Sequence, residues 1–467
     1  MPSAVDPEGR RLPIKLDTTS NGEFVPVPLS AANREANRLA HAAAERNAQR
    51  LNLSKRRFLV SACGAASTLL SFNVANAAAG RTGGYFDLPS EAALEPLAAR
   101  SVADQGEFIF DVQGHFIDTP KGNPKGPDVF VKDVFLDSDT DMMVLSFVPS
   151  RRDSEPVTIQ AADAVRRIVE KLEGTHRLLL HGRVNPNQPG DLEGMDELAG
   201  RWGVSAWKTY TQYGPGGRGF FLTDDVGVRF VEKARALGVK VICIHKGLPF
   251  GPRSYEHSQC GDIGPIAKRF PDVKFLIYHS GFVTSVREQA YDRGAKRDGV
   301  DTLIRSLEES GVKPGSNVYA ELGSTWRFLM RDPEQAAHAM GKLFRYCGED
   351  NVLWGTDSIW YGSPQDQIQA FRTFQISAEL REKHGYPQIT PALRAKVFGL
   401  NAARVYGVSA AEVKKFAARD RVGRAKLAYQ ERPEPHFRTW GPKTRREFLH
   451  FAGSPDQDCQ ALAQRFE

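Results

Sequence analysis

The sequence has little cysteine and lacks most of the short motifs that identify common enzyme classes. Five cysteines are spread through 467 residues without a C-x-x-C pair, which excludes a disulfide framework. No G-x-S-x-G occurs to support a serine hydrolase, and no H-E-x-x-H occurs. No G-x-G-x-x-G follows the first expected strand and there is no G-x-x-x-x-G-K-[ST], so a nucleotide-binding fold is unsupported as well.

Net charge is also small outside the N-terminal region. Residues 1–57 hold ten Lys or Arg and six Asp or Glu, so most of the net charge of +6 lies there. The remaining chain has no basic excess that would favour nucleic-acid binding. With 41% hydrophobic and 25% charged residues, the chain has an ordinary globular composition that can form one large or two medium domains.

The N-terminal region resembles a twin-arginine export signal. Ser54-Lys55-Arg56-Arg57 precedes a weakly hydrophobic, uncharged stretch that runs to Gly80, and Ala75-Asn76-Ala77 fits a cleavage site. We interpret residues 1–79 as a signal region with a long leading part; a buried helix and a lipidated Cys63 are the weaker alternatives. The resemblance implies the twin-arginine translocation machinery as a partner, a periplasmic location and no stable membrane span after cleavage. Proteins exported by that route fold first, which suits a metalloprotein.

Beyond a polar approach segment at 80–105, apolar runs alternate with stretches of helical period. Eight such runs predict strands: 107–113, 142–148, 177–182, 204–210, 239–245, 274–279, 317–322 and 351–356. The clearest helical stretches between them are 161–172, 225–237, 263–270, 300–310, 333–346 and 364–378. This alternation predicts an α/β fold, a (β/α)8 TIM barrel over 106–408, with a doubly wound sheet as the alternative. Residues 409–467 are expected to form a helical or irregular C-terminal extension.

Polar and ionisable side chains stand where several of these strands end. They are Gln113 and His115, His181 and Arg183, Lys208 and Tyr210, His245, His279, Glu321 and Asp357. Barrel enzymes place their chemistry at the carboxyl ends of the strands, so these groups are expected to meet in space. Imidazole and carboxylate together suit zinc, and also manganese or iron. Aromatic side chains after the strands could line a substrate pocket: Phe250, Trp326, Trp360 and Tyr361.

The order of these residues resembles the amidohydrolase superfamily, in particular its amidohydrolase-related branch of metal-dependent hydrolases and non-oxidative decarboxylases. The resemblance covers about residues 107–408. It implies a metal, with zinc favoured, held by His115, His245 and Asp357, with Asp357 also accepting a proton from water. It further implies that His279 acts as an additional ligand or as a catalytic acid or base.

One position departs from the family pattern, because Gln113 stands where the first His of a His-x-His pair is expected. Gln113 is then a weak ligand, or the preferred ion changes, or the site binds without catalysis. Lys208, Arg183 and Glu321 are the candidate substrate-binding residues; internal ion pairs are the plain alternative for each.

We therefore expect an exported metal-dependent hydrolase acting on a small-molecule substrate with a C–N or C–O bond. A decarboxylase of the same fold and a non-catalytic metal-binding or ligand-binding barrel are the alternatives. An oligomer is compatible with the sequence.

Overall fold

Eight parallel strands form the centre of the protein in a computed structural model, which describes residues 6–103, 105–116, 126–173, 176–250, 254–418 and 421–452. They pair in chain order: β2 (Phe110–Gly114), β3 (Met142–Leu145), β4 (Leu178–Arg183), β5 (Ala206–Tyr210), β6 (Val241–His245), β7 (Lys274–Tyr278), β8 (Val318–Glu321) and β9 (Val352–Leu353). A parallel bridge between Gly114 and Ser358 joins the first strand to the segment after the last. The Val112 amide also donates to the Trp354 carbonyl at 3.0 Å. The predicted (β/α)8 barrel is confirmed.

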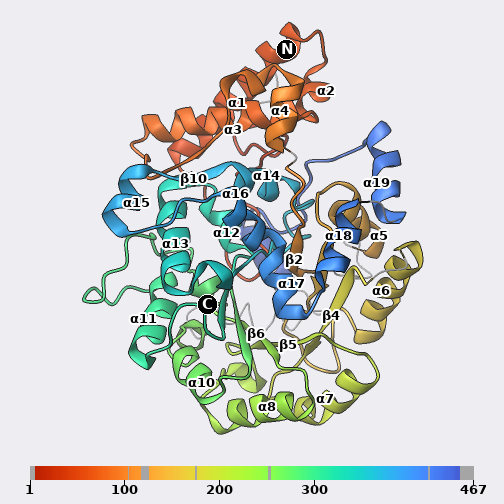
Figure 1. The fold of residues 1–467 in the computed structure, drawn as a ribbon, viewed down its shortest axis with the longest axis vertical. Helices are drawn as coiled ribbons and strands as arrows, with labels where there is room; N and C mark the ends of the chain where they lie inside the picture. Colours follow the sequence, from red (N-terminus) through yellow and green to blue (C-terminus); the bar gives the residue numbers. More distant parts are fainter. Residues whose placement is uncertain are drawn as a thin grey trace.

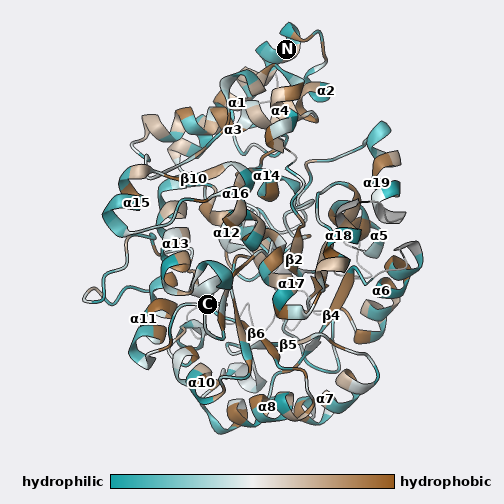
Figure 2. Cartoon of the chain, viewed as in Figure 1, coloured by the Kyte–Doolittle hydropathy of each residue, from teal (hydrophilic) through white to brown (hydrophobic). Residues whose placement is uncertain are grey.

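Helices between the strands surround the barrel (Figure 1). The main ones are α6 (Ile159–Glu173), α7 (Asp191–Gly200), α8 (Asp225–Ala236), α10 (Ile263–Arg269), α11 (Val300–Ser310), α13 (Pro333–Tyr346) and α14 (Gln365–Thr373). Shorter ones are α4 (Pro96–Ala103), α5 (Pro127–Val131), α9 (Tyr255–Ser258), α12 (Thr325–Leu329), α15 (Ala378–His384) and α16 (Pro391–Ala395). Figure 2 shows the strands mostly hydrophobic and the helices mixed, as expected when one helix face packs on a sheet.

One expected helix is shorter than its sequence pattern. The helix expected over 364–378 ends at Thr373, and Phe374–Ile376 forms strand β10, which pairs antiparallel with β1 (Gly84–Phe86). Phe374 and Ile376 are buried while Gln375 is only half-buried, and this alternation of period two suits a strand. The two-stranded sheet ties the approach segment to the barrel.

Apolar side chains close the barrel at the amino ends of its strands. Phe110, Val144, Val241 and Leu276 belong to one buried cluster with residues of α17 (Asn401–Tyr406) and α18 (Ala410–Ala418). Apolar burial of this kind stabilises the barrel by roughly 25 cal/mol per Å2 removed from water. The polar residues are left to the opposite end, where the strands finish.

The N-terminal region is folded. Helices α1 (Ala31–Arg50), α2 (Lys55–Leu59) and α3 (Ala62–Ala78) lie beside β10 and α14 (Figure 1), and Ala40, Ala44 and Phe72 belong to the main buried cluster. Ser30 begins α1 with a capping box in which its hydroxyl accepts from the Asn33 amide. Of the helices in the described ranges, none has both the length and the apolar character needed to cross a membrane.

Residues 12–24 form an extended segment that is almost entirely buried. The C-terminal extension holds it: the Ser20 amide donates to the Pro442 carbonyl at 2.9 Å, and the Thr18 hydroxyl donates to the Lys443 carbonyl at 2.8 Å. That extension continues with α19 (Arg421–Glu431) and α20 (Arg445–Ala452). Residues 18–20 therefore contact residues 442–443.

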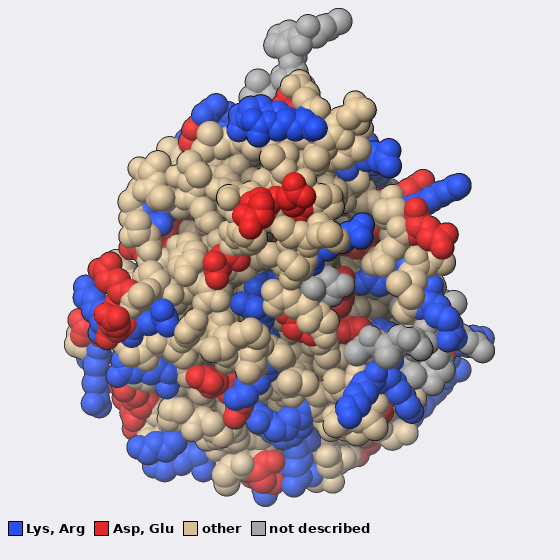
Figure 3. Space-filling view, turned by 45° about the horizontal axis from the view of Figure 1, so that its top comes forward, with Lys and Arg blue, Asp and Glu red and all other residues tan. Residues whose placement is uncertain are grey.

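Acidic and basic side chains are interspersed over the face of the molecule in Figure 3. Neither sign forms a continuous tract there.

Candidate active site

The strands deliver polar side chains to the mouth of the barrel because alternate residues of a strand share one face. Lys208 and Tyr210 leave β5 this way, and Cys243 and His245 leave β6. All four are fully or almost fully buried.

Asp357 is the most heavily contacted group of the site. Its Oδ1 lies 3.1 Å from His115 Nε2 and accepts from Gln113 Nε2 at 2.9 Å. Its Oδ2 accepts from the Ser324 hydroxyl at 2.5 Å and from Asn21 Nδ2 at 2.8 Å. Burial alone would raise the pKa of Asp357, but the contact with His115 and the other donors hold that pKa well below its ordinary value. Asp357 is therefore an anion.

His245 and His279 stand on neighbouring strands with ring centroids 4.4 Å apart. Both side chains are fully buried. Burial lowers the pKa of His279 to about 4 and the pKa of His245 well below its ordinary value. Both rings are therefore neutral near pH 7, which is the form that ligates metals.

The backbone is strained where it presents these groups. His279, Ser324 and Asp357 all have positive φ, at 65°, 52° and 58°. Such conformations cost non-glycine residues of order 1 kcal/mol or more and gather at functional sites. Their concentration at the carboxyl ends of three strands supports a functional role for this end of the barrel.

Lys208 and Glu321 are fully buried near the histidines. They do not form the ion pair with each other that was the plain alternative to substrate binding. Lys208 Nζ has no hydrogen-bond partner and lies 3.8 Å from the centre of the Tyr278 ring. Burial lowers the pKa of Lys208 to about 8 and raises the pKa of Glu321 to about 8. Glu321 accepts from the amides of His279 at 3.0 Å and Gly323 at 2.6 Å, and so fixes the turn that carries His279.

Arg183 and His181 occupy positions with other partners. Arg183 pairs with Glu155 at 2.6 Å and with Asp191 at 2.9 Å. His181 lies deeper, with Nε2 3.4 Å from the hydroxyls of Tyr278 and Tyr406. The Arg183 charge is thus already matched by two carboxylates.

Two of the four predicted pocket aromatics lie beside the histidines. The ring centroids of Phe250 and His245 are 5.1 Å apart, and those of Trp360 and His115 are 6.3 Å apart. Tyr361 reaches the site through its hydroxyl, 2.6 Å from the Ser324 hydroxyl. Trp326 instead donates from its indole to the Gln367 carbonyl and packs in the core.

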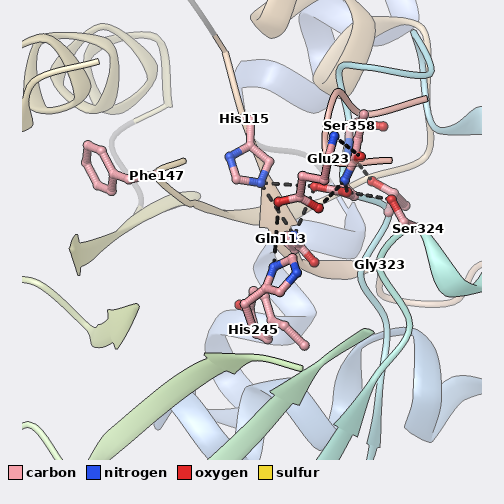
Figure 4. Close-up of polar contacts among 12 residues, drawn as sticks. Glu23, Gln113, His115, Phe147, His245, Gly323, Ser324 and Ser358 are labelled. Carbon is pink, nitrogen blue, oxygen red and sulfur yellow. Dashed lines mark hydrogen bonds and ion pairs between the residues drawn. The ribbon is translucent and has the colours of Figure 1, made fainter. Parts of the chain in front are cut away.

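Sequence reasoning missed Glu23 and Asn21. Glu23 enters the mouth from the N-terminal segment and lies between His115 and His245 (Figure 4). Its Oε1 is 3.6 Å from His245 Nδ1, and its Oε2 accepts from Asn21 Nδ2 at 2.5 Å. Burial and the Asp357 carboxylate raise the pKa of Glu23 well above its ordinary value. No local pattern marks this segment, since its place at the mouth depends on contacts with residues hundreds of positions away.

The donor set fits a divalent metal ion. Neutral imidazoles and carboxylates are the usual ligands of zinc and of similar ions. Among the described residues of the site, the buried atoms without a hydrogen-bond partner include Gln113 Oε1, His115 Nδ1, His245 Nδ1 and His279 Nε2. The atoms that could ligate from Glu23, His245 and His279 lie within 4.8 Å of one another.

Fold and site together define a (β/α)8 barrel with a histidine and carboxylate centre at the carboxyl ends of its strands. Residues 110–408 match the family model described as Amidohydrolase. The chain belongs to that family, and is an enzyme of its superfamily.

Solved structures show similar barrels at low identity. They include 5-carboxyvanillate decarboxylase from Sphingomonas paucimobilis (13% identity, 65% of this chain and 99% of that one, TM-score 0.40). A second is 2,6-dihydroxybenzoate decarboxylase from Rhizobium (14% identity, 65% of this chain and 99% of that one, TM-score 0.39). A third is 4-oxalomesaconate hydratase from Rhodopseudomonas palustris (16% identity, 69% of this chain and 99% of that one, TM-score 0.40). No curated protein matches the sequence.

Proposed function

We propose that the protein is a metal-dependent hydrolase that acts on a C–N or C–O bond of a small molecule. The observation that carries the proposal is the meeting of His115, His245, His279 and Asp357 at the carboxyl ends of four strands, with imidazole nitrogens that have no partner. His115, His245 and Asp357 would hold a divalent ion, with zinc favoured and manganese or iron as alternatives. When bound, such an ion supplies Lewis acidity and activates water.

The chain's own residues supply the rest of the chemistry. Asp357, kept anionic by its donors, accepts the proton that the attacking water loses. Asp357 then passes that proton to the leaving group, and His279, neutral and adjacent, offers its unprotonated Nε2 to the ion as a further ligand or to the substrate. Phe250 and Trp360 present apolar surface beside the two imidazoles.

A decarboxylase of the same fold is the second candidate, favoured by one observation. A carboxylate substrate needs a cation, and Lys208 Nζ is buried at the mouth without a hydrogen-bond partner. Arg183 is less suited, because its guanidinium already binds two carboxylates.

The test compares wild type with Asp357→Asn and with the exposed control Asp153→Asn. Elemental analysis of protein purified without added metal is expected to find a bound divalent ion in wild type. Asp357→Asn is expected to lose at least about 100-fold in kcat, the usual range for a general base. Ester, amide and carboxylic acid substrates are assayed in parallel, and carbon dioxide release identifies a decarboxylase. Full activity in Asp357→Asn would refute the proton path, and protein that never takes up metal would favour a non-catalytic barrel.

We also propose export by the twin-arginine translocation machinery to the periplasm. The support is the sequence pattern, together with the exposure of Arg56 and Arg57 on the short helix α2. Cleavage after Ala77 would leave residues 6–77 held to the barrel by non-covalent contacts alone. Cell fractionation, with mass spectrometry of the N-terminus, tests location and cleavage together; protein found only in the cytoplasm would refute export.

A further inference from the structure

The N-terminal segment reaches the barrel mouth through a tight turn. Gly22 has φ of 88°, a conformation that glycine adopts without strain. The Glu23 amide donates to Asn21 Oδ1 at 3.0 Å, and the Gly22 amide donates to the Ser20 hydroxyl at 3.0 Å. These bonds fix the turn so that its next side chain, Glu23, enters the site.

Buried ion pairs hold the segment in place. Lys15 Nζ lies 2.8 Å from Asp366 Oδ2, and both side chains are at most 3% exposed. Asp17 pairs with Arg327, whose guanidinium also donates to the Lys15 carbonyl. Contacts of this kind position a side chain rigidly, since removing either partner leaves a buried charge.

Two imidazoles near Glu23, those of His245 and His279, each have one nitrogen without a proton. His279 Nδ1 lies 2.6 Å from the Gly323 carbonyl and must donate to it, which leaves Nε2 unprotonated in the neutral ring. His245 Nε2 lies 3.4 Å from the Leu248 carbonyl, which leaves Nδ1 unprotonated. Neither His245 Nδ1 nor His279 Nε2 has a hydrogen-bond partner, and both rings are fully buried.

Two unprotonated nitrogens and a carboxyl oxygen, three potential metal ligands, therefore converge here. The third is Glu23 Oε1, 3.6 Å from His245 Nδ1, and the ligand atoms of the three residues lie within 4.8 Å of one another. Two histidines with one glutamate form a known zinc ligand set with room for water.

Gln113 explains why an additional carboxylate is useful. Its amide nitrogen donates to Asp357 Oδ1 at 2.9 Å, so the strand end that would carry an imidazole in the family pattern supplies a donor instead. Asn21 links the two carboxylates, since its Nδ2 lies 2.5 Å from Glu23 and 2.8 Å from Asp357.

We propose that Glu23 is a metal ligand supplied from outside the barrel by the N-terminal segment. It binds the same divalent ion as His245 and His279. The inference rests on the proposed metal-dependent function, and it adds a residue that lies 87 positions before the matched family region.

The test measures metal binding in the full-length chain by competition with a chromophoric chelator, using Zn2+ and Co2+. Wild type, Glu23→Gln, Glu23→Asp and the control Glu35→Gln are compared. Glu35 belongs to the same N-terminal region but pairs with Arg38 on the exposed surface of α1. Circular dichroism and thermal melting of the metal-free proteins check that each variant is folded.

Wild type and Glu35→Gln are expected to bind equally. Glu23→Gln is expected to bind at least about 100-fold more weakly, since loss of groups that merely orient a ligand already costs 10–100-fold. Glu23→Asp, which keeps a carboxylate, is expected to fall between them, and the Co2+ absorption spectrum should change in Glu23→Gln. Equal affinity and an unchanged spectrum in both Glu23 variants would overturn the role of Glu23 and leave the proposed function standing. Failure of wild type to bind either ion would overturn both.

Discussion

The buried ion pair between Asp17 and Arg327 gives the most direct test of how the N-terminal segment is held. Asp17 is 0% exposed and Arg327 is 2% exposed at the side chain. Asp17 Oδ2 also accepts from the hydroxyls of Thr19 at 3.0 Å and Thr439 at 3.2 Å. Asp17→Asn keeps the shape of the side chain but removes the charge that compensates Arg327.

The expected cost is about 3–5 kcal/mol, the range for breaking a buried ion pair from one side. The matched control is Asp153→Asn, which breaks an Asp–Arg pair whose side chains are 64% and 58% exposed. Exposed pairs of this kind contribute at most about 1 kcal/mol. Adding Arg327→Met to Asp17→Asn removes the stranded charge and is expected to recover part of the loss.

Hydrogen exchange of the amides in residues 12–24 is the appropriate assay, because the segment can leave the barrel without global unfolding. Asp17→Asn should raise the exchange rate of these amides far more than that of amides in β6 or β7. The free energy of global unfolding, measured in urea, should change less than the free energy of local opening of the segment. Exchange in Asp17→Asn equal to that in Asp153→Asn would refute the docking of the segment as described.

Two further predictions concern other parts of the molecule. Burial lowers the pKa of His338 to about 4, so between pH 4 and 6.5 the unfolded chain binds more protons, and stability should fall as pH falls through that window. The free energy of unfolding, measured in urea, should differ between pH 7.5 and pH 5 by about 1–2 kcal/mol less in His338→Gln than in wild type. An unchanged difference would contradict the lowered pKa of His338. Gly441→Ala places a Cβ 1.7 Å from the Ser20 carbonyl oxygen, so it should weaken docking of the N-terminal segment by about 1–3 kcal/mol. Protease cleavage within residues 12–24 should accelerate in that variant, and an unchanged rate would argue against the contact.

The barrel could be predicted because its signals are local. Each strand is an apolar run, each helix has its own period, and the eight repeats follow one another in sequence. His245 and His279 could be placed at the mouth for the same reason, since each directly ends or follows its strand. The one misplaced helix end, at Thr373, depends on pairing with Gly84–Phe86, which no local pattern encodes.

Glu23 could not be predicted from local pattern. Its segment is extended and irregular, and its position depends on Asp366, Arg327 and residues 439–443. The arginine pair at Arg56-Arg57 indicates export, and nothing in the sequence around it indicates that the preceding residues pack against the barrel. A buried, irregular segment is recognised only through its long-range partners.

The contact of residues 18–20 with residues 442–443 has a consequence for how the protein is made. Thr18 and Lys443 are 425 positions apart, and loop closure over such a distance is entropically costly and slow. The barrel strands are synthesised before residues 439–443, so the contacts with those residues can form only when translation is nearly complete. A chain truncated before Thr439 would keep the ion pairs of Lys15 and Asp17 but lose the last contacts that hold the segment of Glu23.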